Sequence, residues 1–126
     1  MPRFALRYLG HRPGASLGYF TGAGVTLKFG DVFDIGAAVV TVGRRETADL
    51  RVASSSVAPA HARLWVDDGR LYLVDLPNNA RTRVNEVQVP RTEQVTLVVG
   101  DYITIADGFD FQVIDRDARA QAAIKS

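Results

Sequence analysis

The amino-acid sequence predicts an all-β fold, an antiparallel β-sandwich of about 10–11 short strands. Apolar and polar residues alternate with a period of two through most of the chain, as in strands that are buried on one face. The alternating segments are rich in β-branched residues and recur about every ten residues, with Gly-containing turns between them. No long stretch has the 3.6-residue period of an amphipathic helix, which favours a sandwich over a mixed fold.

The predicted strands follow this pattern from the N-terminus to residue 114. They lie at residues 4–9, 25–29, 39–42, 62–66, 71–74, 95–99, 102–105 and 109–114. Asp68-Gly69 and Asp107-Gly108 each lie between two apolar runs and predict hairpin turns in which both turn residues have positive φ. Gly100-Asp101 predicts another turn.

Two segments fit this pattern less well. Residues 10–24 are rich in Gly and Pro and predict a long loop, with room for a short strand around residues 17–20. Residues 116–126 contain four alanines and alternating charges. They are compatible with a short exposed helix or with a linker stub, because an isolated helix of about ten residues is marginal in water. We therefore expect one domain over residues 1–115 and a C-terminal tail over residues 116–126.

The composition of the chain argues against several classes of function. The chain has 126 residues and 47% hydrophobic content, which is enough for one domain with its own core. It has no apolar stretch of membrane-spanning length and no signal-peptide core. The absence of cysteine excludes a disulfide framework and a thiolate metal site and fits a reducing compartment, so we expect a cytoplasmic protein. A net charge of +1 gives no general attraction to nucleic acid or anionic membranes, and neither is expected as a partner.

Four short motifs occur in order between residues 42 and 85. Gly43-Arg44 ends an apolar run, Ala58-Pro59-Ala60-His61 follows, and then come residues 75–82 and Val84-Asn85. This order resembles the forkhead-associated (FHA) domain family over roughly residues 25–114, and Gly100-Asp101-Tyr102-Ile103 fits the late hairpin of that family. The resemblance implies an FHA-like β-sandwich that is a non-catalytic protein–protein interaction module, with loops at one end that bind a phosphothreonine peptide.

Compared with the family pattern, this chain keeps the residues at scaffold positions and has lost most of those at ligand-binding positions. It implies a phosphate-contacting arginine at Arg44, but the phosphate-binding serine position holds Ala58 and the peptide-gripping asparagine position holds Ala80. The threonine position just before Ala80 holds Asn79. The residues expected to have structural roles are all retained, namely Gly43, His61, Asp75, Thr82 and Asn85.

These losses have a large expected effect on affinity. A phosphate carries a charge of roughly −1.5 to −2, and each hydrogen bond to a charged group contributes about 1.5–3 kcal/mol. Losing the Ser and Asn donors lowers affinity by several powers of ten, at about 1.4 kcal/mol per tenfold. We therefore expect partner binding that is independent of phosphate, or self-association, in place of ordinary phosphothreonine binding.

An alternative is that this end still reads a phosphorylated or acidic motif through substitute donors. Arg44 would then act with Arg45, Asn79 and Arg81. The candidate binding residues at this end are Arg44, Arg45, Ser55, Ser56, Asn78, Asn79, Arg81 and Arg83. The competing interpretation is that the serines are solvated turn residues and the arginines form a solvated face.

His61 has no partner in the sequence with metal-ligand or catalytic spacing. The other histidine, His11, lies in the early Gly/Pro loop, and no Cys or carboxylate pair has metal spacing with either. We expect His61 to bond to backbone within its own loop. The chain also lacks a nucleophile elbow and a Gly-rich phosphate cradle, so it predicts no enzyme, no metal and no cofactor.

Trp65 is a candidate interface residue. If Ala62, Leu64 and Val66 face the core, then His61, Arg63 and Trp65 face away from it. A tryptophan next to an arginine is typical of an interface, so Arg63 and Trp65 form a candidate docking pair. The alternative is that the opposite sheet edge, or the N-terminal loop with Tyr19 and Phe20, covers the ring.

Overall fold

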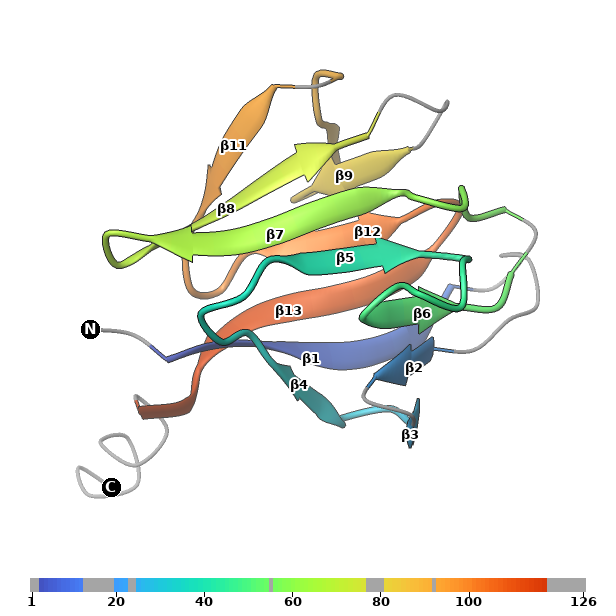
Figure 1. Ribbon diagram of the computed structural model, residues 1–126, viewed down its shortest axis with the longest axis horizontal. Helices are drawn as coiled ribbons and strands as arrows, with labels where there is room; N and C mark the ends of the chain where they lie inside the picture. The colour runs from blue at the N-terminus through green and yellow to red at the C-terminus, as the bar shows by residue number, and fades with distance from the viewer. Residues whose placement is uncertain are drawn as a thin grey trace.

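The computed structural model describes residues 3–12, 20–22, 25–54, 56–76, 81–91 and 93–117. Two β-sheets pack face to face (Figure 1), which confirms the prediction of an all-β sandwich. No described segment forms a helix that is long and apolar enough to cross a membrane. The alternative of a C-terminal helix falls almost entirely outside the described residues, because only residues 116 and 117 of that tail are described.

The first sheet has six strands, all antiparallel to their neighbours. In spatial order they are β10 (Val87–Gln88), β9 (Thr82–Val84), β12 (Tyr102–Ile105), β13 (Phe109–Asp115), β1 (Phe4–His11) and β4 (Val32–Asp34). The longest pairing joins the first and last parts of the chain, with Leu6 opposite Val113. The register of this pair shifts between Tyr8 and His11, so β1 carries an irregularity as it approaches its end.

The second sheet has seven strands. In spatial order they are β11 (Gln94–Leu97), β8 (Arg70–Asp75), β7 (Ala62–Asp67), β5 (Val40–Gly43), β6 (Leu50–Val52), β2 (Phe20–Gly22) and β3 (Val25–Leu27). β5 and β6 run parallel, so the prediction of a wholly antiparallel sandwich is wrong at this pair. The two strands overlap by only two residue pairs. A connection between parallel strands must bring the chain back along the length of the overlap, and the short connection of residues 44–49 is enough for so short an overlap.

The described residues form 13 strands, more than the sequence predicts. The strands that sequence reasoning missed are β4, β6, β9 and β10, with two or three residues each. Such short segments give no readable alternation, because a period of two needs at least four residues to be seen. The strand considered around residues 17–20 is β2 at residues 20–22, while residues 17–19 lie outside the described part.

The core lies between the two sheets and is built from the inward faces of the predicted strands. Phe109, Phe111 and Val113 of β13 are fully buried, as are Leu64 of β7 and Leu73 of β8. Tyr8 packs its ring against Phe111 with a centroid separation of 5.2 Å. These large side chains bury the apolar surface that stabilises the domain, and they leave the loops to carry function.

Two hairpin turns were predicted, and one has a different form. Asp68 and Gly69 have φ of 50° and 73°, which confirms a turn with both residues in the left-handed region. The second predicted hairpin is also present, but Ala106 and Gly108 have positive φ and Asp107 does not, so the prediction of positive φ at both Asp107 and Gly108 is wrong. Ile105 pairs with Phe109, so three residues connect the strands, and three-residue loops need a left-handed residue at a different position.

A third tight turn joins β9 to β10 and is fixed by one side chain. Asn85 and Glu86 have φ of 51° and 72°. The Asn85 side chain donates from Nδ2 to Asp101 Oδ1 at 3.0 Å and accepts from the Tyr102 backbone N–H at 2.9 Å. Asp101 Oδ2 in turn accepts from the Val98 N–H at 2.9 Å. One asparagine therefore ties the turn after β9 to the turn before β12.

We expect Asn85→Ala to lower the free energy of unfolding by about 2 kcal/mol, because it removes two hydrogen bonds and places a Cβ-bearing residue without a polar side chain at positive φ. Asn85→Gly should lose less, since glycine accepts that φ at no steric cost. Urea unfolding of both variants measures the difference. Equal stability of Asn85→Ala and the wild type would contradict this role for the asparagine.

Candidate functional site

Four connections meet at one end of the sandwich, which we call the loop end. Their described residues are 44–49 after β5, 53–54 and 56–61 before β7, 76 and 81 between β8 and β9, and 106–108 after β12, at the right of Figure 1. Hydrogen bonds link the described parts of these connections to each other. The Arg81 carbonyl, for example, accepts from the Ala106 N–H at 2.8 Å.

Gly43 lets two of these connections approach closely. The Arg44 and Arg45 N–H groups donate to the carbonyls of Ala58 and Pro59 at 3.0 and 3.2 Å. A Cβ added to Gly43 would lie 2.2 Å from the Pro59 carbonyl oxygen, far inside van der Waals contact. Only glycine allows this backbone approach, which places Arg44 beside residue 58.

His61 joins the connection before β7 to the one after β8. Its side chain is buried, with Nδ1 accepting from the Ala58 N–H at 3.2 Å and Nε2 donating to the Arg81 carbonyl at 2.8 Å. Burial lowers the pKa of the imidazole; the hydrogen bond to the Arg81 carbonyl opposes this in part, and the charge of Arg81 adds to the lowering. The ring therefore stays neutral, with its proton on Nε2. The expected bond within its own loop is present, and the bond across to Arg81 is additional.

Asp75 and Thr82 connect the end of β8 to the start of β9. The Thr82 hydroxyl donates to Asp75 Oδ1 at 2.7 Å, and both side chains are buried. Asp75 Oδ2 has no hydrogen-bond donor among the described residues. Burial raises the pKa of the Asp75 carboxyl, while the Thr82 hydrogen bond and the charge of Arg91 act in the opposite direction. The pair holds both ends of the connection that spans residues 77–80.

Arg44 extends along the neighbouring loop and is not neutralised. It is exposed, and its Nε donates to the Val57 carbonyl at 3.1 Å. No described carboxylate forms a salt bridge with it; Asp49 instead accepts from the Thr41 N–H at 2.9 Å. The guanidinium is therefore held next to residue 58 with its terminal N–H groups available to a ligand.

Arg51 is a second cation at this end and was missed by sequence reasoning. It lies opposite Gly43 in the parallel pair of β5 and β6, and its Nε donates to the Arg44 carbonyl at 3.2 Å. The signal was the Leu50-Arg51-Val52 alternation, which is too short to be recognised as a strand. Arg45 and Arg81 are also exposed at this end, without a salt bridge to any described carboxylate.

The two described serines before residue 58, Ser54 and Ser56, offer little to an anion. The Ser56 hydroxyl donates to Asp107 Oδ1 at 3.1 Å and lies 3.1 Å from the hydroxyl of buried Ser54. Its proton is thus already donated to a carboxylate whose charge repels a phosphate. The candidates Ser55, Asn78 and Asn79 lie outside the described residues.

Comparison with known proteins identifies the family. A model of the FHA domain family matches residues 40–106. This chain belongs to the FHA domain family. It is therefore a protein–protein interaction module of a family known for binding phosphothreonine peptides. A search of curated proteins found no match.

Solved FHA domains share the fold at low sequence identity. The FHA domain of an Arabidopsis thaliana hypothetical protein has a TM-score of 0.69 and 20% identity, over 91% of this chain and 86% of that one. The FHA domain of CT664 from Chlamydia trachomatis has a TM-score of 0.68 and 19% identity, over 90% and 97% of the two chains. The N-terminal FHA domain of S. cerevisiae Rad53p, in complex with a phosphothreonine peptide, has a TM-score of 0.64 and 21% identity, over 84% and 98%.

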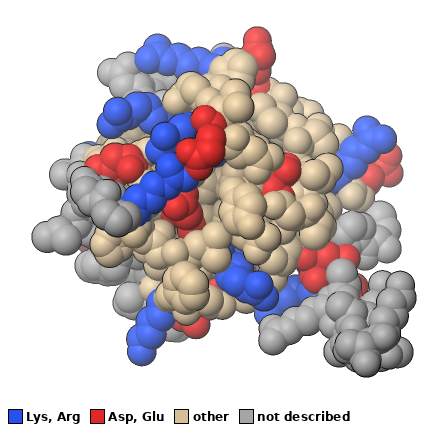
Figure 2. All heavy atoms as spheres, turned by 180° about the vertical axis from the view of Figure 1, so that it is seen from behind, with Lys and Arg blue, Asp and Glu red and all other residues tan. Residues whose placement is uncertain are grey.

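Arg83 does not join the arginines of the loop end. It lies in β9 opposite Thr104, and its charge helps to lower the pKa of Glu86. The larger contribution comes from a hydrogen bond from Arg12, which also forms a salt bridge with Asp110 at 2.9 Å. Figure 2 shows basic and acidic side chains next to one another on the face seen from behind Figure 1. Sequence reasoning missed this ion-pair network, because its members are far apart in the chain.

Trp65 of the FHA domain is half-buried on the outer face of the seven-stranded sheet. Its ring stacks on Tyr72 of β8, its cross-strand neighbour, with centroids 5.8 Å apart and an interplanar angle of 29°. Arg63 is exposed on the same strand, while Leu64 between them is buried. Tyr72 thus provides a cover that the sequence did not indicate; Tyr19 and the Phe20 side chain lie outside the described part.

No three His, Cys, Asp or Glu residues group as a metal site in the described ranges.

We expect Gly43→Ala to lower the free energy of unfolding by about 2 kcal/mol, because the new methyl group would overlap the Pro59 carbonyl and force the two connections apart. Gly36→Ala is the matched control, since a Cβ there meets nothing within 4 Å. Chemical denaturation of the two variants and the wild type provides the measurement. If both substitutions have the same effect, the close approach at Gly43 is not required.

We also expect the Asp75→Asn variant to become more stable relative to the wild type as pH rises from about 3 to about 7. Burial raises the folded-state pKa of Asp75 above its usual 3.8, so its contribution to stability is full below 3.8 and is lost as pH rises through the folded-state pKa. Asparagine keeps an acceptor for Thr82 and does not ionise. Denaturation at a series of pH values, with Asp68→Asn at an exposed turn as control, measures this. A pH-independent difference between Asp75→Asn and wild type would refute it.

Proposed function

We propose that this FHA domain is a non-catalytic module that docks a partner protein through its loop end without reading phosphothreonine in the usual way. The observation that carries the proposal is the state of the hydroxyl groups beside Arg44. Position 58 has a methyl group, and the nearest described serine, Ser56, donates its hydroxyl to Asp107 at 3.1 Å. A phosphate bound by Arg44 would find a methyl group at position 58, and the nearest described serine hydroxyl is already donated to a carboxylate.

The energetic argument follows from the number of donors that a phosphate needs. Its oxygens require several charge-assisted hydrogen bonds at once, each contributing about 1.5–3 kcal/mol. Ala58 removes one donor and Ala80 removes the amide that would grip the peptide main chain. These effects act in the same direction and support binding that does not depend on phosphate.

The loop end nevertheless has the properties of a docking surface. Arg44, Arg45, Arg51 and Arg81 give it exposed or partly exposed guanidinium groups, and arginine is enriched in protein interfaces. The hydrogen bonds of His61 hold the underlying backbone in place, so a partner pays little to order it. Both ring nitrogens of His61 bond to backbone, which supports a structural and not a catalytic role. The absence of cysteine supports a cytoplasmic setting.

A second candidate function is a phosphopeptide or acidic-motif reader that uses Arg44 with Arg45, Asn79 and Arg81. It is favoured by the fact that Arg44 has no salt bridge to a described carboxylate, which leaves its charge available to an anion. The Rad53p domain was solved with a phosphothreonine peptide, so the shared fold supports such a ligand. The tied Ser56 hydroxyl weighs against it.

A degenerate phosphothreonine peptide library, read by fluorescence polarisation, tests the proposal. We expect the wild type to show no selective binding, and the double variant Ala58→Ser with Ala80→Asn to gain at least tenfold in affinity, because it restores two lost donors. Adding Arg44→Ala to the double variant should remove this gain. Micromolar binding by the wild type that Arg44→Ala abolishes would instead establish the second candidate.

A further inference from the structure

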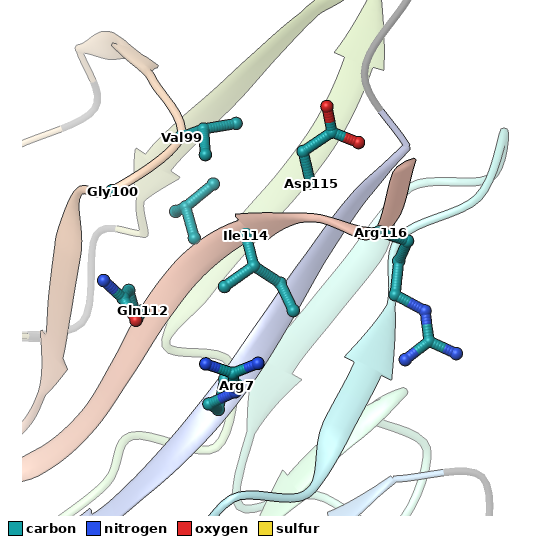
Figure 3. A pocket seen from close by; sticks show the side chains of 8 residues that line it. Arg7, Val99, Gly100, Gln112, Ile114, Asp115 and Arg116 are labelled. Atoms are coloured by element: carbon teal, nitrogen blue, oxygen red, sulfur yellow. The ribbon is translucent and has the colours of Figure 1, made fainter. Parts of the chain in front are cut away.

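The outer face of the six-stranded sheet carries an open cavity of about 740 Å³, which we call the Arg7 cavity. It lies toward the end of β13, away from the loop end. Figure 3 shows the side chains that line it. They come from β1, from β13 and its C-terminal extension, and from the turn before β12, and include Arg7, Val99, Gly100, Gln112, Ile114 and Arg116. Nothing in the loop-end proposal uses this surface.

The strand register places a row of interaction-prone side chains across this face. Arg7 lies opposite Gln112, and Gln112 lies opposite Tyr102, so three neighbouring strands present a cation, an amide and a phenol side by side. Gln112 Nε2 donates to the Tyr102 hydroxyl at 3.4 Å. Tyr102 is 47% exposed and Val99 is 46% exposed, so apolar surface accompanies the polar row.

Arg7 has no salt bridge to a described carboxylate, because the carboxylates nearby are bound to other groups. Asp115 Oδ1 accepts from the backbone N–H groups of Arg3 and Asp117 at 3.0 and 2.9 Å, and in Figure 3 this carboxylate points away from Arg7. Asp34 pairs with Arg116 at 3.2 Å. The guanidinium of Arg7 therefore has no salt bridge to a described carboxylate, in a hollow that is lined both by apolar residues (Val99, Val113 and Ile114) and by Gln112, Asp115 and Arg116.

We infer that the Arg7 cavity is a second docking site, for an unphosphorylated protein segment that carries a carboxylate next to an apolar side chain. The carboxylate accepts two parallel hydrogen bonds from the Arg7 guanidinium, a geometry that arginine provides and lysine does not. The apolar side chain packs on Val99 and Ile114, and Tyr102 extends the contact. A phosphate fits less well, because it needs several cationic donors and the described surface offers one uncompensated cation.

The test is a titration of short unphosphorylated peptides in which a single Asp is flanked by Leu or Phe. Binding is read by fluorescence polarisation and mapped by amide chemical shifts. We expect Kd values below about 100 μM, at least tenfold weaker binding of the matching Asn peptides, and shifts at β1 and β13. Arg7→Glu, and Arg7→Gln as a milder variant, should weaken binding at least tenfold. Lys28→Glu makes the same charge change at an exposed position that does not line the cavity, and it should leave binding unchanged.

Several results would overturn the inference. These are no binding of any acidic peptide up to about 1 mM, equal binding of the Asn peptides, or no effect of the Arg7 variants while their thermal unfolding matches the wild type. Loss of binding with Arg44→Ala and not with Arg7→Glu would show that the peptides use the loop end. Sedimentation that reveals a dimer disrupted by Arg7→Glu would make a second copy of the chain the occupant and would refute a distinct partner segment.

Discussion

The loop end depends on one buried, neutral imidazole. His61 accepts from the Ala58 N–H and donates to the Arg81 carbonyl. Through these two bonds it joins the connection between β6 and β7 of the seven-stranded sheet to the connection that leads from β8 of that sheet to β9 of the six-stranded sheet. Burial keeps the ring neutral, so one nitrogen stays an acceptor and the other a donor. If the ring were protonated, Nδ1 would become a donor facing the Ala58 N–H, and a buried polar group left unpaired costs about 1–3 kcal/mol. The position of Arg44 follows from this arrangement and from the close approach at Gly43.

This constraint explains why the scaffold can persist while the reading residues change. Gly43, His61, Asp75 and Thr82 bond to backbone or to each other beneath the surface, and none of these bonds involves a ligand. Ala58, by contrast, contributes only its backbone N–H and carbonyl to the scaffold, through His61 and Arg44. A change of its side chain from hydroxymethyl to methyl therefore leaves the fold intact. The same separation applies to Arg44, whose backbone is part of the scaffold and whose terminal guanidinium groups are not.

The sequence predicted the long strands, because the alternation in segments such as residues 62–66 and 109–114 directly reflects one buried face. It did not predict β6 or the position of Arg51 beside Arg44, since three residues carry no readable period and parallel pairing leaves no turn signal. The Ser56–Asp107 hydrogen bond joins residues that are 51 positions apart, and the sequence around either residue gives no indication of it. The motifs thus indicated which side chains are present at the loop end, while the hydrogen bonds that decide which of them remain available to a ligand required the structure.

The arginines of this FHA domain fall into two groups, and the fold determines which group each one joins. Arg12 and Arg116 are neutralised by Asp110 and Asp34. Arg44 and Arg7 are held by the fold without a described carboxylate, one at the loop end and one on the outer face of the six-stranded sheet. A guanidinium that is paired internally must lose that partner before it binds another, whereas an unpaired one gains the full charge-assisted bond. Arg44 and Arg7 lie on separate surfaces, so one partner protein that contacts both would gain affinity from two weak contacts at once.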